Sequence, residues 1–284
     1  MKRLFWIALL IFVLGVIATI TFGLIAREEL RSFASGKDEY DKITKNYSPE
    51  EIAGLTNISV DIFNRALYVL PSETDEIIVQ YYNTPYGKIT EKLEDSRLSF
   101  DESIVVKIFH FGLDWLKSLM YPDYNRFYLY LPENLTVNLK LNTTNGRLEI
   151  KNINLTELKG ATSNGRIVLE DLNATKIDVA SSNGAIIASR VEALESIKLK
   201  TSNGRISVDG METPYLFCDT SNGRINVEIE GNKDEYYINM TTTNGSYYVN
   251  GEKSRNAEIN DEDLAKKIIL DTSNGDISIF FSTK

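Results

Sequence analysis

The stretch that decides the fold is TSNGRIVLE at residues 162–170, which returns as TSNGRISVD at 201–209 and as TSNGRINVE at 220–228. The Asn-Gly pair inside it recurs with successive spacings of 19, 19, 20, 19, 22 and 30 residues, and Ser or Thr fills both positions before every pair. A period of this length is the signature of an architecture built from stacked repeats. The repeated asparagines are Asn145, Asn164, Asn183, Asn203, Asn222, Asn244 and Asn274.

Apolar residues alternate with polar ones on both sides of each Asn-Gly pair. In the repeat centred on Asn164, Leu158 precedes the turn, and Ile167 and Leu169 follow it. The corresponding positions of the other repeats also hold apolar residues. Alternation with a period of two predicts a strand, a turn and a second strand, with one face of each strand buried.

Two topologies share this pattern, because Asn-Gly between alternating strands is also a strong signal for a hairpin. A meander or sandwich of hairpins, however, gives no reason for identical rows of residues. In a solenoid, each coil stacks on the next at ~4.8 Å, so equivalent residues form ladders. We therefore predict an all-β, single-stranded β-solenoid with coils of about 19–20 residues, in which the repeated asparagines form a structural ladder at the turns.

The predicted body covers residues 55–284. Residues 55–100 lack Asn-Gly but keep short apolar runs, which we interpret as degenerate first coils. The longer spacings near the C-terminus add polar residues at 251–263, which predict a surface loop. Residues 104–121 are a largely apolar insertion with polar residues at helical spacing. They predict an amphipathic helix that either caps one end of the solenoid or lies on a membrane or a partner.

The chain begins with a positively charged tip, residues 1–3, and an uncharged apolar run of 23 residues at 4–26. This run exceeds the ~20 residues needed to cross a bilayer and is longer than the ~7–15 apolar residues of a cleaved signal peptide, which remains the alternative. We predict one transmembrane helix at 4–26, in contact with the lipid bilayer, followed by a spacer at 27–54. The positive-inside tendency places residues 1–3 in the cytoplasm and the body outside the cell membrane.

Composition narrows the possible chemistry. A net charge of −9 and a pI near 4.9 disfavour nucleic acid as a partner. The single cysteine, Cys218, excludes an internal disulfide and a cysteine-based metal site, and is typical of a small core residue. His110 is the only histidine, and no phosphate-binding loop, zinc-ligand spacing or nucleophile elbow is present. We expect no catalytic residue, no metal and no cofactor.

One row of cations is a candidate binding feature. Four arginines stand two places after an Asn: Arg147, Arg166, Arg205 and Arg224. On neighbouring coils they would repel one another at ~5 Å unless negative charge offsets them. Local carboxylates such as Glu149 or Asp219 would do this, and so would an anionic polymer. Ala185, Ser246 and Asp276 interrupt the row, and no matching row of aspartates supports a polysaccharide-cleaving β-helix.

The repeated Thr-Ser-Asn-Gly-x-Ile-x-Val units follow an extended segment that ends in Leu129-Tyr130-Leu131-Pro132. Together they resemble the bacterial and archaeal "putative adhesin" domain of unknown function, which LiaG-like envelope-stress proteins carry. The resemblance covers residues 55–284. It implies a β-solenoid at the cell envelope, often behind one N-terminal span, without established catalytic residues.

These observations favour a non-catalytic, membrane-anchored cell-envelope protein that presents a rigid solenoid for binding, adhesion or scaffolding. Its partner would be an envelope polymer or another membrane protein. One alternative is an accessory regulator of an envelope-stress or other membrane system, acting through the transmembrane segment. A second alternative is an enzyme active on envelope polysaccharide, which would need an unusual site.

Overall fold

The computed structural model describes residues 11–21, 23, 24, 27, 41–84, 87–104 and 123–282. Residues 11–21 are helical, and no helix of the described residues is long and apolar enough to cross a membrane. Much of the predicted span at 4–26 lies outside these residues. Of the helix predicted at 104–121, Ile104 instead ends a strand, and the rest, with His110, is outside the described part of the chain.

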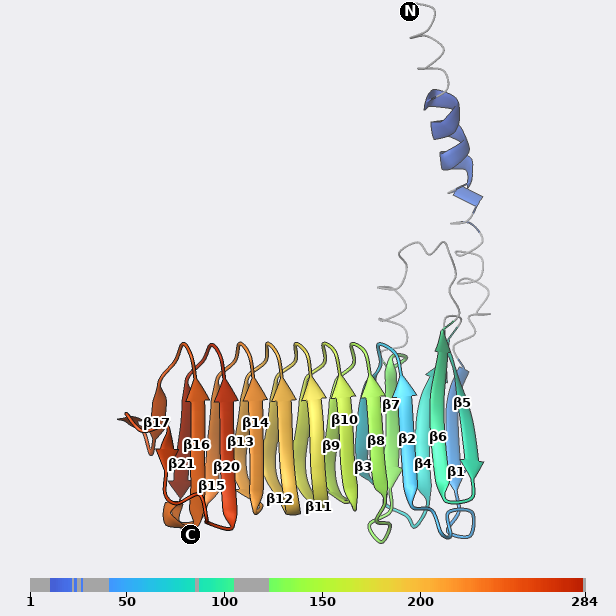
Figure 1. The fold of residues 1–284 in the computed structure, drawn as a ribbon. Helices are drawn as coiled ribbons and strands as arrows, with labels where there is room; N and C mark the ends of the chain where they lie inside the picture. Colours follow the sequence, from blue (N-terminus) through green and yellow to red (C-terminus); the bar gives the residue numbers. More distant parts are fainter. Residues whose placement is uncertain are drawn as a thin grey trace, which may run out of the picture.

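The body is all-β, as predicted, and forms one elongated stack of strands in two layers (Figure 1). One layer holds the strands that run toward the edge bearing the Asn-Gly turns: β2 (Asn57–Ile62), β6 (Arg97–Ile104), β8 (Asn138–Thr143), β10 (Glu157–Thr162), β14 (Tyr215–Thr220), β16 (Tyr236–Thr242) and β20 (Lys266–Thr272). The other holds the strands that run away from that edge: β3 (Ala66–Pro71), β7 (Arg126–Leu131), β9 (Leu148–Asn154), β13 (Ile206–Glu212), β15 (Ile225–Glu230), β17 (Tyr247–Val249) and β21 (Ile277–Ser282).

Two long strands, β11 (Ile167–Ser181) and β12 (Ile186–Thr201), pass from one layer to the other. They pair in parallel with Ile167 opposite Ile186, and β12 pairs with β13 with Ile186 opposite Ile206. These partners are 19 and 20 residues apart in sequence, so the coils stack in the predicted register. The three isoleucines are fully buried and belong to one core that runs along the body.

The Asn-Gly turns form a ladder at one edge of the stack. The amide of each repeated asparagine donates to the side-chain oxygen of the asparagine in the preceding coil of the stack, at 2.6 Å from Asn183 to Asn164 and 2.7 Å from Asn203 to Asn183. Glycine is required beside them, because a Cβ at Gly184 would lie 1.7 Å from the carbonyl oxygen of Gly165. The sequence motif therefore reflects a close approach between successive turns.

Chain order and spatial order differ at the C-terminal end. β20 lies between β14 and β16, and β21 lies between β15 and β17. The predicted loop at 251–263 contains β18 (Glu252–Ser254) and β19 (Glu258–Ile259), which pair antiparallel with β17 and β16. The surface-loop prediction is wrong for these strands, because the outermost coil has a free edge that they cover in part. A short 3-10 helix, Lys233–Glu235, precedes β16.

The N-terminal end is rearranged in the same way. β2 pairs with both β6 and β8, and β3 pairs with both β7 and β9, so the β6–β7 coil lies outside the β2–β3 coil. β4 (Ile77–Asn83) and β5 (Gly87–Glu94) are antiparallel to their neighbours, and so is β1 (Asp41–Tyr47). The degenerate-coil interpretation therefore fails for β4. Part of the predicted spacer, residues 41–47, is a strand of the body.

Candidate binding site

The four predicted arginines lie in one row beside the Asn-Gly edge. Their order follows from backbone bonds between successive coils: Leu148 N donates to Arg166 O, Ile186 N to Arg205 O and Ile206 N to Arg224 O, each at 3.0 Å. Ala185 stands between Arg166 and Arg205, because Ile167 N donates to its carbonyl oxygen. The structure thus brings the predicted residues together, with the interruption that the sequence shows.

Internal ion pairs occupy part of this row. Arg147 contacts Glu149 at 2.8 Å, and Arg224 approaches Asp276 at 3.8 Å. Arg166 and Arg205 are exposed and form no ion pair within the described ranges. Asp219, the other carboxylate considered from the sequence, lies on β14 in register with Asp271 and does not join the row.

The row continues into coils that lack the repeat. Leu67 N donates to Arg147 O at 2.7 Å, and Ala66, which precedes Leu67, is in register with Arg126 of β7. Arg126 therefore extends the row beyond Arg147, with Ala66 between them. The sequence did not suggest Arg126 as a site residue, because no Asn-Gly pair marks its coil and its neighbours in space are distant in the chain.

Next to Arg126, three tyrosines with nearly parallel, stacked rings form a cluster that we call the tyrosine platform: Tyr68, Tyr128 and Tyr130. The alternation of RFYLYL in β7 buries Phe127, Leu129 and Leu131 and turns the two tyrosines outward. The rings of Tyr68 and Tyr128 are stacked with centroids 5.0 Å apart, and those of Tyr128 and Tyr130 are 6.2 Å apart and inclined by 12°.

A hollow of about 250 Å³ lies beside the platform. Its lining residues are Lys42, Gln80, Tyr81, Tyr82, Asp123, Arg126, Tyr128 and Tyr130. They come from β1, β4, β7 and the segment before β7, so strands that are antiparallel or out of chain order build the site. The alternation of tyrosines in 126–131 was a usable signal, but the neighbouring strands were not predictable from the repeat.

Arg126 is fixed over the platform by polar contacts. Its Nη1 donates to Asp123 Oδ1 at 2.6 Å and to the Tyr128 hydroxyl at 3.1 Å, and its guanidinium lies 5.9 Å from the centroid of the Tyr68 ring. The hydrogen bond with Tyr128 raises the pKa of Arg126. Burial, and then the nearby Tyr128 and Asp123, raise the pKa of Tyr130. Tyr130 is therefore neutral and the Arg126 guanidinium charged near neutral pH.

Comparison with known families identifies the domain. Residues 42–280 match the family described as Toastrack DUF4097. The chain belongs to this family. This confirms the resemblance to an adhesin-type domain of unknown function and assigns almost the whole described body to one Toastrack unit. No curated protein matches the chain.

Solved structures similar to this Toastrack chain include three bacterial proteins. The putative cell adhesion protein of Clostridium sporogenes is 14% identical over 86% of this chain and 100% of its own, with a TM-score of 0.41. The putative adhesin of Bacteroides fragilis is 13% identical over 85% and 97%, with a TM-score of 0.40. That of Parabacteroides distasonis is 13% identical over 86% and 98%, with a TM-score of 0.39.

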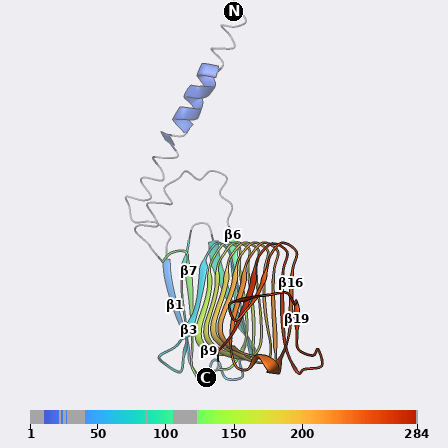
Figure 2. The same ribbon diagram turned by 90° about the vertical axis from the view of Figure 1, so that its left-hand side faces the viewer.

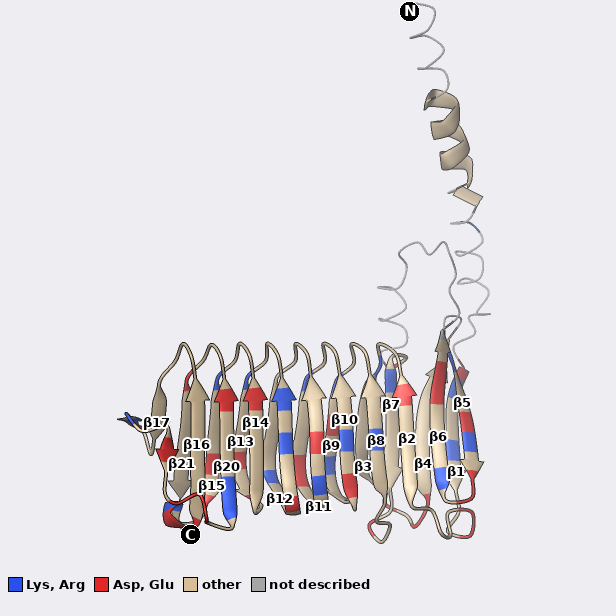
Figure 3. Ribbon diagram, in the orientation of Figure 1, with Lys and Arg blue, Asp and Glu red and all other residues tan. Residues whose placement is uncertain are grey.

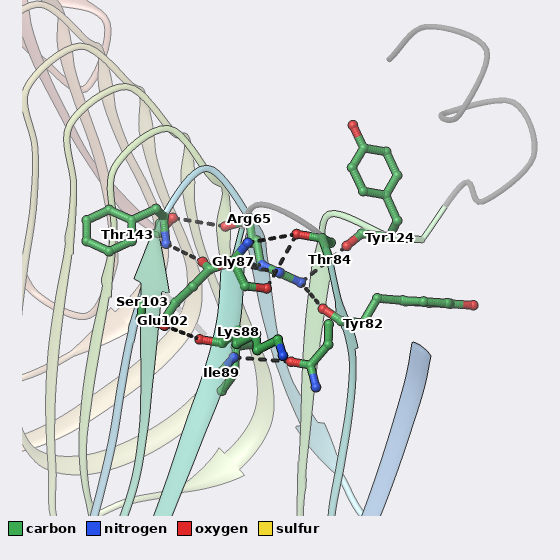
Figure 4. Close-up of polar contacts among 12 residues, drawn as sticks. Arg65, Tyr82, Thr84, Gly87, Lys88, Ile89, Glu102, Ser103, Tyr124 and Thr143 are labelled. Carbon is green, nitrogen blue, oxygen red and sulfur yellow. Dashed lines mark hydrogen bonds and ion pairs between the residues drawn. The ribbon is translucent and has the colours of Figure 1, made fainter. Parts of the chain in front are cut away.

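A second polar cluster of the Toastrack body is structural (Figure 4). Arg65 and Glu102 are both nearly inaccessible to solvent and are 2.7 Å apart. Arg65 Nη1 also donates to the carbonyl oxygens of Tyr82 and Tyr124, at 2.6 and 3.3 Å. The second oxygen of Glu102 accepts from Phe63 N at 2.8 Å. The cluster uses its donors and acceptors internally, so it joins strands and leaves little capacity for a ligand.

A larger and shallower hollow, of about 770 Å³, lies at the far corner of the Toastrack coils. Leu155, Ala193, Leu194 and Pro214 line it, with stacked Glu192 and Glu212. Two carboxylates at one strand spacing repel an anion there. The tyrosine platform, by contrast, combines aromatic rings and a hollow with the cations of the arginine row beside it.

Proposed function

We propose that this Toastrack protein is a non-catalytic cell-envelope protein, anchored in the membrane by residues 4–26, whose body presents binding surfaces outside the cell. The proposal depends on one observation, which is that the chain enters the body at the Asn-Gly edge. The two longest apolar segments of the sequence, 4–26 and the insertion after Ile104, are both joined to the Asn-Gly edge.

The strand register places these connections. β1 begins with Asp41 opposite Asn83, the last residue of β4. β6 ends at Ile104, opposite Gly87. β7 begins at this edge too, because Ala66 N, just after the first turn, donates to Asn125 O at 2.9 Å. Figure 2 shows β1, β6 and β7 reaching the same side of the stack.

The chemistry of this edge suits a position against lipid headgroups. The four residues of each repeated turn are Thr or Ser, then Thr or Ser, then Asn and Gly, so the turns are uncharged. Figure 3 shows them without Lys, Arg, Asp or Glu, whereas both signs of charge occur along the strands. A neutral edge does not repel the anionic headgroups that an acidic protein would otherwise avoid. The stack would then lie along the membrane with its layers standing away from it.

Fractionation of native cells tests the anchoring. The full chain with a C-terminal epitope is expected in the membrane fraction, resistant to carbonate but degraded by protease added to intact protoplasts. Deletion of residues 4–26 should release it, whereas the conservative variant Val13→Leu should not. An epitope that is protected in intact protoplasts and degraded only after lysis would contradict the proposed orientation.

Binding of the full chain in detergent to purified native envelope tests the surface. Salt-sensitive sedimentation supports an electrostatic contact, since exposed charges are screened over ~10 Å at 0.1 M salt. Arg166→Ala with Arg205→Ala should weaken it. Arg190→Ala is the matched control, because Arg190 is exposed but already bound by Asp171 and Glu170. Equal binding by all variants would exclude the arginine row as the contact.

A further inference from the structure

The tyrosine platform and the arginine row meet on one layer of the body. Tyr68 is in register with Tyr128 on one side and with Glu149 on the other, and Glu149 pairs with Arg147. Arg126 lies over the platform and belongs to the same row as Arg147 and Arg166. A ligand on the platform could therefore extend directly along the cations of the following coils.

The platform itself favours a flat ring with one apolar face. Its three rings are half-buried and nearly parallel, and Tyr68 stacks on Tyr128. Tyr128 and Tyr130 line the hollow, where they offer carbon surface together with hydroxyl groups. The hollow of about 250 Å³ is slightly below the ~300–1,000 Å³ of sites that enclose drug-sized ligands. It has room for one ring unit, and the rest of a longer ligand would lie outside it.

Polar groups at the rim suit a hydroxylated ring with a negative charge. Gln80 offers an amide that donates and accepts, and Lys42 and Arg126 offer two cations against the single carboxylate of Asp123. Asp123 is held by Arg126, so the cationic character dominates. A quaternary ammonium ligand would also favour aromatic rings, but here it would face Lys42 and Arg126 and be repelled.

We propose that the platform and its rim bind a uronic acid unit of an acidic envelope polysaccharide, with one pyranose ring in the hollow against Tyr128 and Tyr130 and further carboxylates along Arg166 and Arg205. The coil spacing of ~4.8 Å gives this row a regular set of positions for a repeating polyanion, apart from the gaps at Ala66 and Ala185. This inference rests on the proposed function, because only an exterior body meets such a polymer in the cell.

Purified full chain in detergent tests the inference with three probes: alginate oligomers as a uronate polymer, dextran oligomers as a neutral one and polyphosphate as a polyanion without rings. Alginate is expected to bind, dextran to bind at least tenfold more weakly and polyphosphate to bind more weakly than alginate. Tyr128→Ala should weaken alginate binding about tenfold, as loss of a stacking ring does, without weakening polyphosphate. Arg126→Gln should weaken both and reduce the salt dependence.

Tyr248→Ala is the matched control, because Tyr248 lies on β17 at the opposite end of the same layer. It should leave all binding unchanged. Circular dichroism establishes whether each variant is folded, and Gln80→Ala replaces Tyr128→Ala as the test if that variant does not fold. Alginate binding that is unaffected by both platform changes, or polyphosphate binding as tight as alginate binding, would overturn the inference. The assay is independent of location, so this result would leave the fractionation test standing.

Discussion

At the scale of single residues, Arg65 is informative because it occupies the place that glycine takes in the repeats. Asn64 begins the asparagine ladder, and Arg65 O lies where a Cβ on Gly146 would clash. No Asn-Gly pair stands in the sequence between β6 and β7, the strands of the coil outside Arg65. The Arg65 guanidinium ties β4, β6 and the segment before β7 together.

Arg65→Met is expected to lower the free energy of unfolding by ~3–5 kcal/mol, because it leaves the Glu102 carboxylate buried without its cation. Denaturant unfolding monitored by circular dichroism measures the change. The double variant Arg65→Met with Glu102→Leu should be more stable than the single variant, since it removes both charges. A double variant less stable than either single one would show that the pair itself holds the end of the stack.

Substitutions at two kinds of glycine should have opposite effects on the stability of the fold. Gly184→Ala is expected to cost ~3 kcal/mol or more, because its Cβ would overlap the backbone of the preceding turn. Gly210 has a φ of +62°, and the equivalent Asn152, Asp171 and Arg190 have φ of 54°, 53° and 50°. Gly210→Asn should therefore be neutral or stabilise by up to ~1 kcal/mol. Thermal unfolding of both variants measures these effects. A Gly184→Ala variant as stable as the unmodified protein would refute the close-approach explanation.

At the scale of elements, the sequence repeat predicted the order of the strands in the middle of the stack but not at its two ends. Period and alternation were sufficient for β8 to β15, where each coil meets the next along the chain. They could not place β20 between β14 and β16, because all three strands carry the same apolar pattern and are equally compatible as neighbours. The tyrosine platform was missed for the same reason, since its strands meet through non-repeating pairings.

The insertion of β20 puts two carboxylates side by side, Asp219 and Asp271. Burial, and then the charge of Asp219, raise the pKa of Asp271 above its ordinary value. Below the unfolded pKa of ~3.9, the Asp271 carboxyl is protonated in both states and does not reduce the free energy of unfolding. As pH rises through the raised folded pKa, the carboxyl ionises and destabilises the fold.

Asp271→Asn should therefore stabilise the protein at pH 7 by a few tenths to ~1 kcal/mol, and this gain should vanish near pH 3. Unfolding midpoints measured across this pH range provide the test. The matched control is Asp178→Asn, because Asp178 lies in register between Lys159 and Lys198 and its loss should destabilise at pH 7. A constant effect of Asp271→Asn at all pH values would rule out the electrostatic cause.

At the scale of the whole molecule, the described body has one continuous core and terminal coils that are held by non-local strands. Repeat arrays with simple sequential order tend to fray from their ends, because each unit contacts only its neighbours. Here β16 cannot separate from the stack without leaving β20, which also pairs with β14. We therefore expect the body to unfold in one transition rather than coil by coil.

Leu270→Ala tests this coupling, because Leu270 is fully buried in β20. It should cost ~2–5 kcal/mol, and hydrogen exchange should accelerate together in β14, β16 and β20. Ile269→Ala, at the neighbouring outward position, is the control and should change exchange little. Acceleration confined to β16 and β17 would instead show that the last coil opens independently.

The exchange of strand order at both ends also bears on how such a chain can change in length. The rearranged strands form a cap at each end of the body. Between the two caps, the coils from Asn145 to Asn222 stack in chain order. Duplication or loss of one 19-residue unit there would alter the length of the stack by ~4.8 Å and leave both caps intact. Descendants of one ancestral gene could thus differ in reach along the cell surface by whole coils while keeping identical ends.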